Sequence, residues 1–188
     1  MTIPANITAG TWTLDGSHSE VGFVVRHAGI SKVRGKFNEV EATATVGSTV
    51  ADTTVNAVIK SASFDSGDAN RDGHVKSADF FDVEVFPELT FVSTEISGDG
   101  EDYKLTGDLT IKGITQPVTF DVEFAGTAVD PFGNTRAGFS GKTVISRKDF
   151  GLTWNAALET GGVLVSDKVT ITLELSFIAP AAEAAAAE

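Results

Sequence analysis

The chain has 188 residues, the length of a single domain, and no cysteine, so it has neither a disulfide framework nor a thiolate site. Its formal net charge of −12, from 26 Asp and Glu against 14 Lys and Arg, disfavours nucleic acid and anionic membrane surfaces as partners. No apolar run approaches the roughly 20 residues that span a bilayer, so stable membrane insertion is not expected.

Alternating apolar and polar residues, the pattern of half-buried strands, begin at Val21 and recur along most of the chain. The extended segments expected in chain order lie at about 12–15, 21–27, 31–46, 54–64, 89–96, 103–111, 118–124, 136–145 and 169–178. Turn-forming residues, such as the DPFGN run at 130–134, separate them. Within 31–46, Gly35 is expected to mark a bend or a bulge rather than the end of a strand.

The stretch 70–91 departs from this alternation. It begins with a charged, weakly helical piece at 70–78, and the aromatic pair Phe80 and Phe81 follows. In a chain rich in strands, a lone helix beside two adjacent Phe residues is expected to cover one end of an apolar interior. We therefore interpret this stretch as a plug or lid.

The count of about eight strands, separated by turns, predicts an antiparallel all-β domain. Two architectures bury one face of such strands: a sandwich of two sheets, or one sheet closed into a barrel. Closure has the advantage that it removes exposed sheet edges. An eight-stranded barrel encloses either a packed core or room for one small ligand.

The aromatic residues bear on this choice. There are 13 Phe but only one Tyr and two Trp, a bias toward rings without a hydrogen-bonding group. For each Phe, the simplest interpretation is that it fills the core. The alternative is that a subset lines a tunnel suited to an extended hydrocarbon chain.

Catalytic and metal sites have weak support in the sequence. Asp15, His18 and Ser19 are the residue types of a hydrolase triad, but they lie too close in sequence for the required geometry to be expected. His18, His27 and His74 lack a short metal-ligand spacing such as H-x-H. We therefore predict no catalytic residue, no metal site and no cofactor.

Four separated motifs resemble those of the YceI family of lipocalin-like proteins. The stretch 15–37, DGSHSEVGFVVRHAGISKVRGKF, is similar to the opening signature of the family, and 71–82 is similar to its central RD-x-H-x-x-S-x-DFFD segment. GDLTIKGIT at 107–115 and RKDFG at 147–151 resemble its hairpin and closing motifs. The resemblance covers about 11–177.

The resemblance implies an eight-stranded antiparallel lipocalin-like β-barrel with one short helix near its mouth. It also implies an apolar lumen that holds a long amphiphile such as a polyisoprenoid or an isoprenoid quinone, and a transport or storage role without catalysis. The barrel domain is expected at 11–179, after an N-terminal extension at 1–10 and before an Ala/Glu-rich disordered tail at 180–188.

The candidate ligand contacts are apolar, and most of them are aromatic. They are Phe23, Val25, Phe80, Phe81, Phe91, Phe139, Phe150 and Trp154. Arg71 and His74 are candidates for contact with the polar head of the ligand, although they could instead belong to a solvated, partly ion-paired helix surface. Arg147 and Asp149 are interpreted as a structural pair.

The alternative function is that of a ligand-free β-domain acting as a protein-interaction or stress-response module. A carrier predicts a continuous apolar lumen, whereas a module predicts a filled core and an exposed apolar patch elsewhere. The sequence leaves the oligomeric state open, with a homodimer as one option. Because no secretory signal is visible at the N-terminus, we expect a cytoplasmic location, or a periplasmic or secreted one if a leader was removed.

Overall fold

The structure, a computed structural model, describes residues 2–181. The strands are β1 (Gly10–Leu14), β2 (Glu20–His27), β3 (Ser31–Phe37), β4 (Val40–Val46), β5 (Thr54–Lys60), β6 (Phe64–Asp65), β7 (Glu88–Asp99), β8 (Asp102–Ile111), β9 (Ile114–Val129), β10 (Thr135–Ser146) and β11 (Val165–Ile178). The helix α1 is Ala69–Lys76, and the 3-10 turns are η1 (Gly16–His18), η2 (Val50–Asp52), η3 (Ser61–Ser63) and η4 (Arg147–Phe150). Most of the predicted tail, 182–188, lies outside the described residues.

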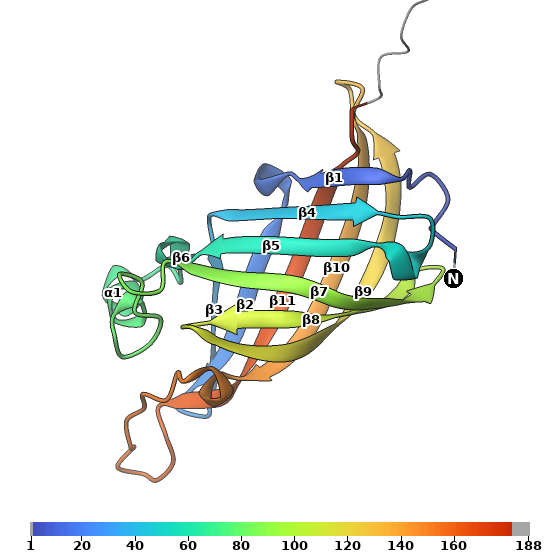
Figure 1. The fold of residues 1–188 in the computed structure, drawn as a ribbon. Helices are drawn as coiled ribbons and strands as arrows, with labels where there is room; N and C mark the ends of the chain where they lie inside the picture. The colour runs from blue at the N-terminus through green and yellow to red at the C-terminus, as the bar shows by residue number, and fades with distance from the viewer. Residues whose placement is uncertain (1, 182–188) are drawn as a thin grey trace, which may run out of the picture.

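Eight of the strands form a closed antiparallel barrel (Figure 1). The hydrogen-bonded order is β1-β4-β5-β7-β8-β9-β10-β11, and β1 returns to the C-terminal end of β11 through the pairs Thr13–Ile178 and Leu14–Phe177. The remaining strands, β2, β3 and β6, continue the same sheet from β11. The predicted eight-stranded barrel with one helix is therefore confirmed.

Three neighbouring stretches of extended chain are each divided into two shorter strands, and the three breaks lie side by side across the sheet. β1 continues into β2 after η1, β3 into β4 after the pair 38–39, and β5 into β6 after η3. Beyond these breaks β6 pairs with β3, whereas β5 pairs with β7 up to Lys60 and Glu88. The wall therefore opens between β6 and β7, and the segment 66–87, which contains α1, connects the two sides of this opening (Figure 1).

The strand expected at 31–46 is two strands, β3 and β4, separated at 38–39. Gly35 lies within β3 and does not end it, as expected, but the pairing of β3 with β2 keeps one register, so the alternative of a bulge at this glycine is wrong. Gly35 instead lies opposite Phe23 of β2, and a Cβ at Gly35 would overlap the Phe23 ring. The missing side chain lets Phe23 stack on Phe64, with ring centroids 5.0 Å apart. The glycine thus permits close aromatic packing, one of the roles that an isolated glycine in a strand can have.

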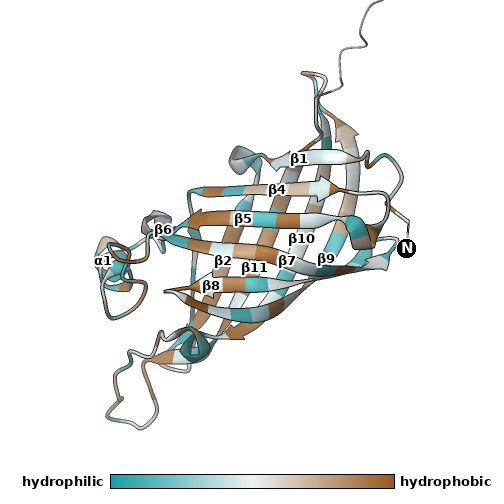
Figure 2. Ribbon diagram, viewed as in Figure 1, coloured by the Kyte–Doolittle hydropathy of each residue, from teal (hydrophilic) through white to brown (hydrophobic). Residues whose placement is uncertain are grey.

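The inward faces of the strands carry the apolar residues, and their alternation is visible as colour bands along the strands in Figure 2. The larger of two buried clusters includes Phe91, Phe120 and Phe150, and the smaller centres on Trp12 and Phe177. The strand β9 follows the predicted alternation, whereas burial along β2 does not alternate, because Gly22 is buried and Val21, Phe23, Val24 and Val25 are all half-buried. Among the described residues, no helix has the length and apolar character needed to cross a membrane.

Ser61 holds the corner where β5 leaves β7. Its side chain is completely buried, and its hydroxyl donates a hydrogen bond of 2.7 Å to the carbonyl of Phe86. Its backbone N–H donates to the carbonyl of Pro87 at 2.9 Å. These two hydrogen bonds attach the corner to the last residues of the segment 66–87, just before β7 begins.

We expect Ser61→Ala to lower the free energy of unfolding by about 1–3 kcal/mol, because it leaves the half-buried carbonyl of Phe86 without the hydroxyl donor. Chemical denaturation at neutral pH measures this loss. Ser48→Ala, at an exposed turn position, is the control and should change stability by less than about 0.5 kcal/mol. Equal effects of the two changes would contradict the role given to Ser61.

Arg136 closes the seam where β1 meets β11. From β10 its Nη1 donates to Asp15 Oδ2 at 2.7 Å, and its Nε donates to Asp130 Oδ2 at 2.8 Å. Hydrogen bonds from Ser17, Arg136 and His18 hold the pKa of Asp15 well below its usual range. Hydrogen bonds from Arg136 and Asn134 do the same to the pKa of Asp130.

Arg136→Met should lower the melting temperature at neutral pH, and the difference from the wild type should narrow as the pH falls below about 4. The direction of this pH dependence follows from the lowered pKa values of Asp15 and Asp130. Their ionised side chains stabilise the fold fully above the ordinary Asp pKa, and this stabilisation is lost as the pH falls and they become protonated. Thermal melts from pH 7 to pH 2.5 test this. Lys104→Met, which removes an exposed pair with Asp121, should leave the melting temperature nearly unchanged at every pH.

Candidate ligand-binding lumen

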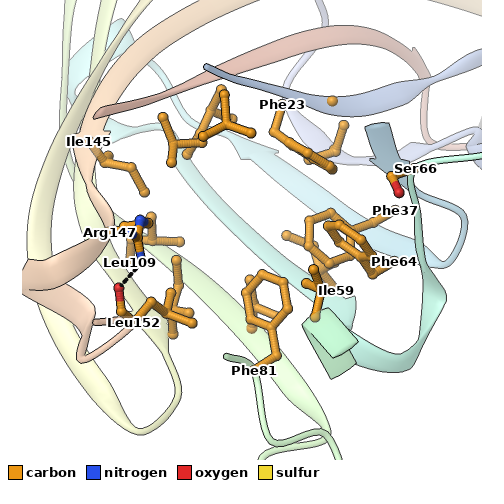
Figure 3. A pocket seen from close by; sticks show the side chains of 18 of the residues that line it. Phe23, Phe37, Ile59, Phe64, Ser66, Phe81, Leu109, Ile145, Arg147 and Leu152 are labelled. Atoms are coloured by element: carbon orange, nitrogen blue, oxygen red, sulfur yellow. Dashed lines mark hydrogen bonds between the residues drawn. The ribbon is translucent and has the colours of Figure 1, made fainter. Parts of the chain in front are cut away.

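The barrel encloses an apolar cavity of about 570 Å³ that runs from α1 and the neighbouring loops into the interior. Its wall includes side chains of β2, β3, β5, β7, β8 and β11. Figure 3 shows Phe81, Ile59 and Phe64 on one side of this space and Ile145 and Leu152 on the other. The volume lies within the range of about 300–1,000 Å³ that is typical of sites for small molecules and cofactors.

Most of the residues predicted to contact a ligand line this cavity. They are Phe23, Val25, Phe80, Phe81, Phe91 and Trp154, together with the head-group candidates Arg71 and His74. Phe139 instead lines a smaller cavity, and Phe150, which is 1% exposed, packs in the core and is not among the lining residues. Contact with a ligand stays a prediction for all of them.

A cluster of Phe rings forms one wall of the cavity. The ring centroid of Phe64 lies 5.7 Å from those of both Phe37 and Phe81, and the centroids of Phe37 and Phe81 are 5.8 Å apart. Phe37 and Phe64 line the cavity but are not among the ligand contacts predicted from the sequence. Alternation along 31–37 could have found Phe37, which shares the inward face with Val33, but Phe64 lies in a two-residue strand that is too short for any periodicity to orient.

Helix α1 brings the head-group candidates to the mouth of the cavity. The Asp68 side chain accepts a hydrogen bond of 2.8 Å from the N–H of Arg71 and so caps the helix start. Arg71 donates from Nε and Nη2 to the hydroxyl and carbonyl of Ser66, at 2.7 and 2.8 Å. His74 Nε2 lies 2.9 Å from Asp79 Oδ2, and the imidazole packs edge-on against Trp154 at 4.6 Å. Both side chains are therefore oriented by neighbours beside the opening.

Arg147, which our sequence analysis placed in a pair with Asp149, is instead a buried lining residue. It is 4% exposed, and Nε and Nη1 donate to the carbonyls of Ser166, Leu152 and Trp154 at 2.7–2.9 Å (Figure 3). Its guanidinium lies 5.9 Å from the centre of the Phe80 ring. Burial lowers the pKa of Arg147, and the charge of Asp167 opposes this effect. No sequence spacing indicates these partners, because all of them are backbone carbonyls, two from the loop after η4 and one from the start of β11.

Within the described part of the chain, the ionisable side chains that line the cavity are Arg and His. The lining contains Arg26, Arg71, Arg147, His27 and His74, and none of its residues is Asp or Glu. The whole chain, by contrast, carries a formal net charge of −12. The lining is therefore suited to an electron-rich or anionic group at the mouth and to hydrocarbon deeper in the barrel.

The contacts of Asp15 and His18 are those of a turn and not of a hydrolytic triad. His18 Nδ1 lies 2.8 Å from Asp15 Oδ2 and 3.0 Å from Ser17 Oγ, so both neighbours share one ring nitrogen. In a triad, the acid and the nucleophile lie at opposite nitrogens. The hydroxyl of Ser19 accepts a hydrogen bond from the backbone N–H of Ser176. Within residues 2–181, no three acidic or histidine side chains gather in a way that could hold a metal ion.

Comparison with known proteins gives consistent matches. The chain matches the YceI-like domain over residues 12–177. It is 40% identical over 139 residues to the protein YceI of Escherichia coli, an alignment that covers 73% of each chain.

Two solved structures share the fold. BcnA of Burkholderia cenocepacia superposes with a TM-score of 0.76 at 30% identity, over 87% of this chain and 98% of that one. A polyisoprenoid binding domain from Saccharophagus degradans superposes with a TM-score of 0.70 at 17% identity, over 90% of this chain and 98% of that one.

Arg147→Met should lower the free energy of unfolding by at least about 3 kcal/mol, because several buried carbonyls lose their donor together. Urea denaturation followed by Trp fluorescence measures the change. Lys148→Met, at the exposed neighbouring position, is the matched control and should have little effect. A stable Arg147→Met protein would show that these carbonyls find other donors.

Proposed function

The chain belongs to the YceI family, and from this and the geometry of its lumen we propose that it binds a long isoprenoid-type lipid inside the barrel. The lipid would be a polyisoprenoid or an isoprenoid quinone. The role would be transport or storage, without catalysis.

The observation that carries this proposal is the apolar lumen itself. An eight-stranded barrel can be filled by its own side chains, yet this one encloses about 570 Å³. A ligand-free module predicts a filled core, so the cavity favours the carrier. Each ligand methylene buried there would contribute about 0.8 kcal/mol before the costs of association.

Two further observations support the proposal. The Saccharophagus degradans domain of the same fold is described as polyisoprenoid binding, and we extend that ligand class to this chain as a proposal. The basic lining near the mouth, with Arg71 and His74 on α1, suits the electron-rich end of such a ligand. A diphosphate and a quinone ring both offer oxygen acceptors to these donors.

The test begins with native mass spectrometry of the purified protein, followed by organic extraction and lipid analysis of the released species. Ala57→Trp places a large ring in the lumen from β5 and should reduce the bound lipid at least about tenfold. Asn56→Trp, one residue away on the exposed face of the same strand, is the matched control and should retain the lipid. The head group of the extracted lipid separates a polyisoprenoid from a quinone.

Two results would contradict the proposal. The first is a wild-type protein that is empty after purification and takes up no added isoprenoid or quinone, which would favour the interaction module. The second is equal lipid binding by the two Trp variants, which would place the lipid outside the lumen. The cytoplasmic location and the homodimer stay predictions, which cell fractionation and size-exclusion chromatography with light scattering would test.

A further inference from the structure

A second cavity, of about 140 Å³, lies at the end of the barrel opposite α1, where the N-terminal segment lies (Figure 1). Its wall comes from seven barrel strands, β4, β5 and β7 to β11. Ile3, Pro4 and Ile7 of the segment 2–9 complete the lining. No charged side chain is among its lining residues. We call this space the far cavity and the space of about 570 Å³ the main cavity.

The two cavities lie in series along the barrel. Five residues line both of them: Val55, Leu105, Leu173, Leu175 and Phe177. These side chains come from β5, β8 and β11, and they form the boundary that the two cavities share. An apolar chain that reaches the inner end of the main cavity therefore meets the far cavity next.

The N-terminal segment forms the floor of the far cavity. Ile3 and Ile7 pack against the cluster that contains Trp12, which is 2% exposed. The indole Nε1 of Trp12 donates a hydrogen bond of 2.9 Å to the carbonyl of Thr8. The segment is thus attached by two apolar side chains and one buried ring, and it ends the lumen at a defined depth.

We propose that the far cavity receives the distal end of the ligand tail and that its floor sets the longest tail the barrel accepts. This inference rests on the proposed function. The far cavity has about a quarter of the volume of the main cavity, 140 against 570 Å³, so a tail that fills the main cavity could extend by about a quarter of its length. Because the lining offers no charged partner, this end takes hydrocarbon and excludes the polar head.

Phe139 lies where only the end of a long ligand tail would reach it. This residue, predicted from sequence to contact the ligand, lines only the far cavity, where its ring lies 5.3 Å from Phe124 and 6.1 Å from Phe177. It would contact only tails long enough to pass the boundary residues. Phe23 and Phe81, in the main cavity, would contact tails of every length.

The test changes the boundary and the floor separately. Val55→Phe adds bulk where the cavities meet, and the double change Ile3→Ala and Ile7→Ala deepens the floor. Val92→Phe, on neighbouring β7 with a 49% exposed side chain, is the matched control for the first change. Delipidated proteins are incubated with an equimolar mixture of all-trans polyprenols from farnesol to solanesol, and native mass spectrometry reports which lengths are bound.

We expect Val55→Phe to shift the bound mixture toward shorter polyprenols, with the longest species that the wild type binds reduced at least about tenfold relative to the shortest. Val92→Phe should match the wild type, and the floor variant should shift the mixture toward longer species. Circular dichroism and thermal melts establish that each variant is folded.

Three results would overturn the inference. One is a folded Val55→Phe protein with the wild-type length distribution, and another is an equal loss at all lengths. If Val55→Phe does not fold, the floor variant decides, and an unchanged distribution in that variant overturns the inference. A wild-type protein that binds no polyprenol of any length and no added isoprenoid quinone would instead refute the proposed function, so the two failures are distinguishable.

Discussion

The structure depends on a barrel wall that is closed over only part of its height. On the side of the three strand breaks that contains β1, β4 and β5, eight strands pair in a ring, and their inner faces contribute to one apolar interior. Beyond these breaks β6 pairs with β3 and not with β7, so the backbone pairing that would close the wall is missing there. The segment 66–87 covers the gap, and the mouth of the lumen lies beside it. If β6 paired with β7, the sheet would be closed here and there would be no opening for the segment with α1 to cover.

Polar and apolar groups are separated along the barrel as a consequence of this geometry. The backbone that leaves the sheet near the mouth exposes carbonyls, and Arg147 satisfies those of Ser166, Leu152 and Trp154 from a buried position. The basic side chains of the lining come from the end of β2, from α1 and from η4. Deeper in the barrel the backbone groups are paired in the sheet, and the lining is hydrocarbon. A ligand with one polar end and one apolar tail matches this gradient.

Much of the fold could be predicted because it follows from local patterns. Alternation located the strands, and β9, with Val118 and Phe120 buried, shows it most clearly. The charged stretch at 70–78 was correctly separated as the helix. The close packing at Gly35 was not predicted, because a glycine in a strand can mark a bend, a bulge or a close approach, and only the partner ring of Phe23 decides among them. Six of the eight predicted contacts line the main cavity: Phe23, Val25 and Phe91 from strands, Phe80 and Phe81 from the covering segment, and Trp154 from the loop after η4.

The sequence by itself therefore determined the strands, their inward faces, the helix and the family, since each is encoded in short-range spacing or in separated motifs that can be compared directly. Only the tertiary structure decided whether the interior is filled or hollow, because a void is the difference between side-chain volume and the space that eight paired strands enclose. It also decided the place of Arg147, whose partners are backbone carbonyls, and of Phe139, which lies on an inward face but beyond the boundary residues. Such positions depend on contacts between residues far apart in the chain, which no local pattern records.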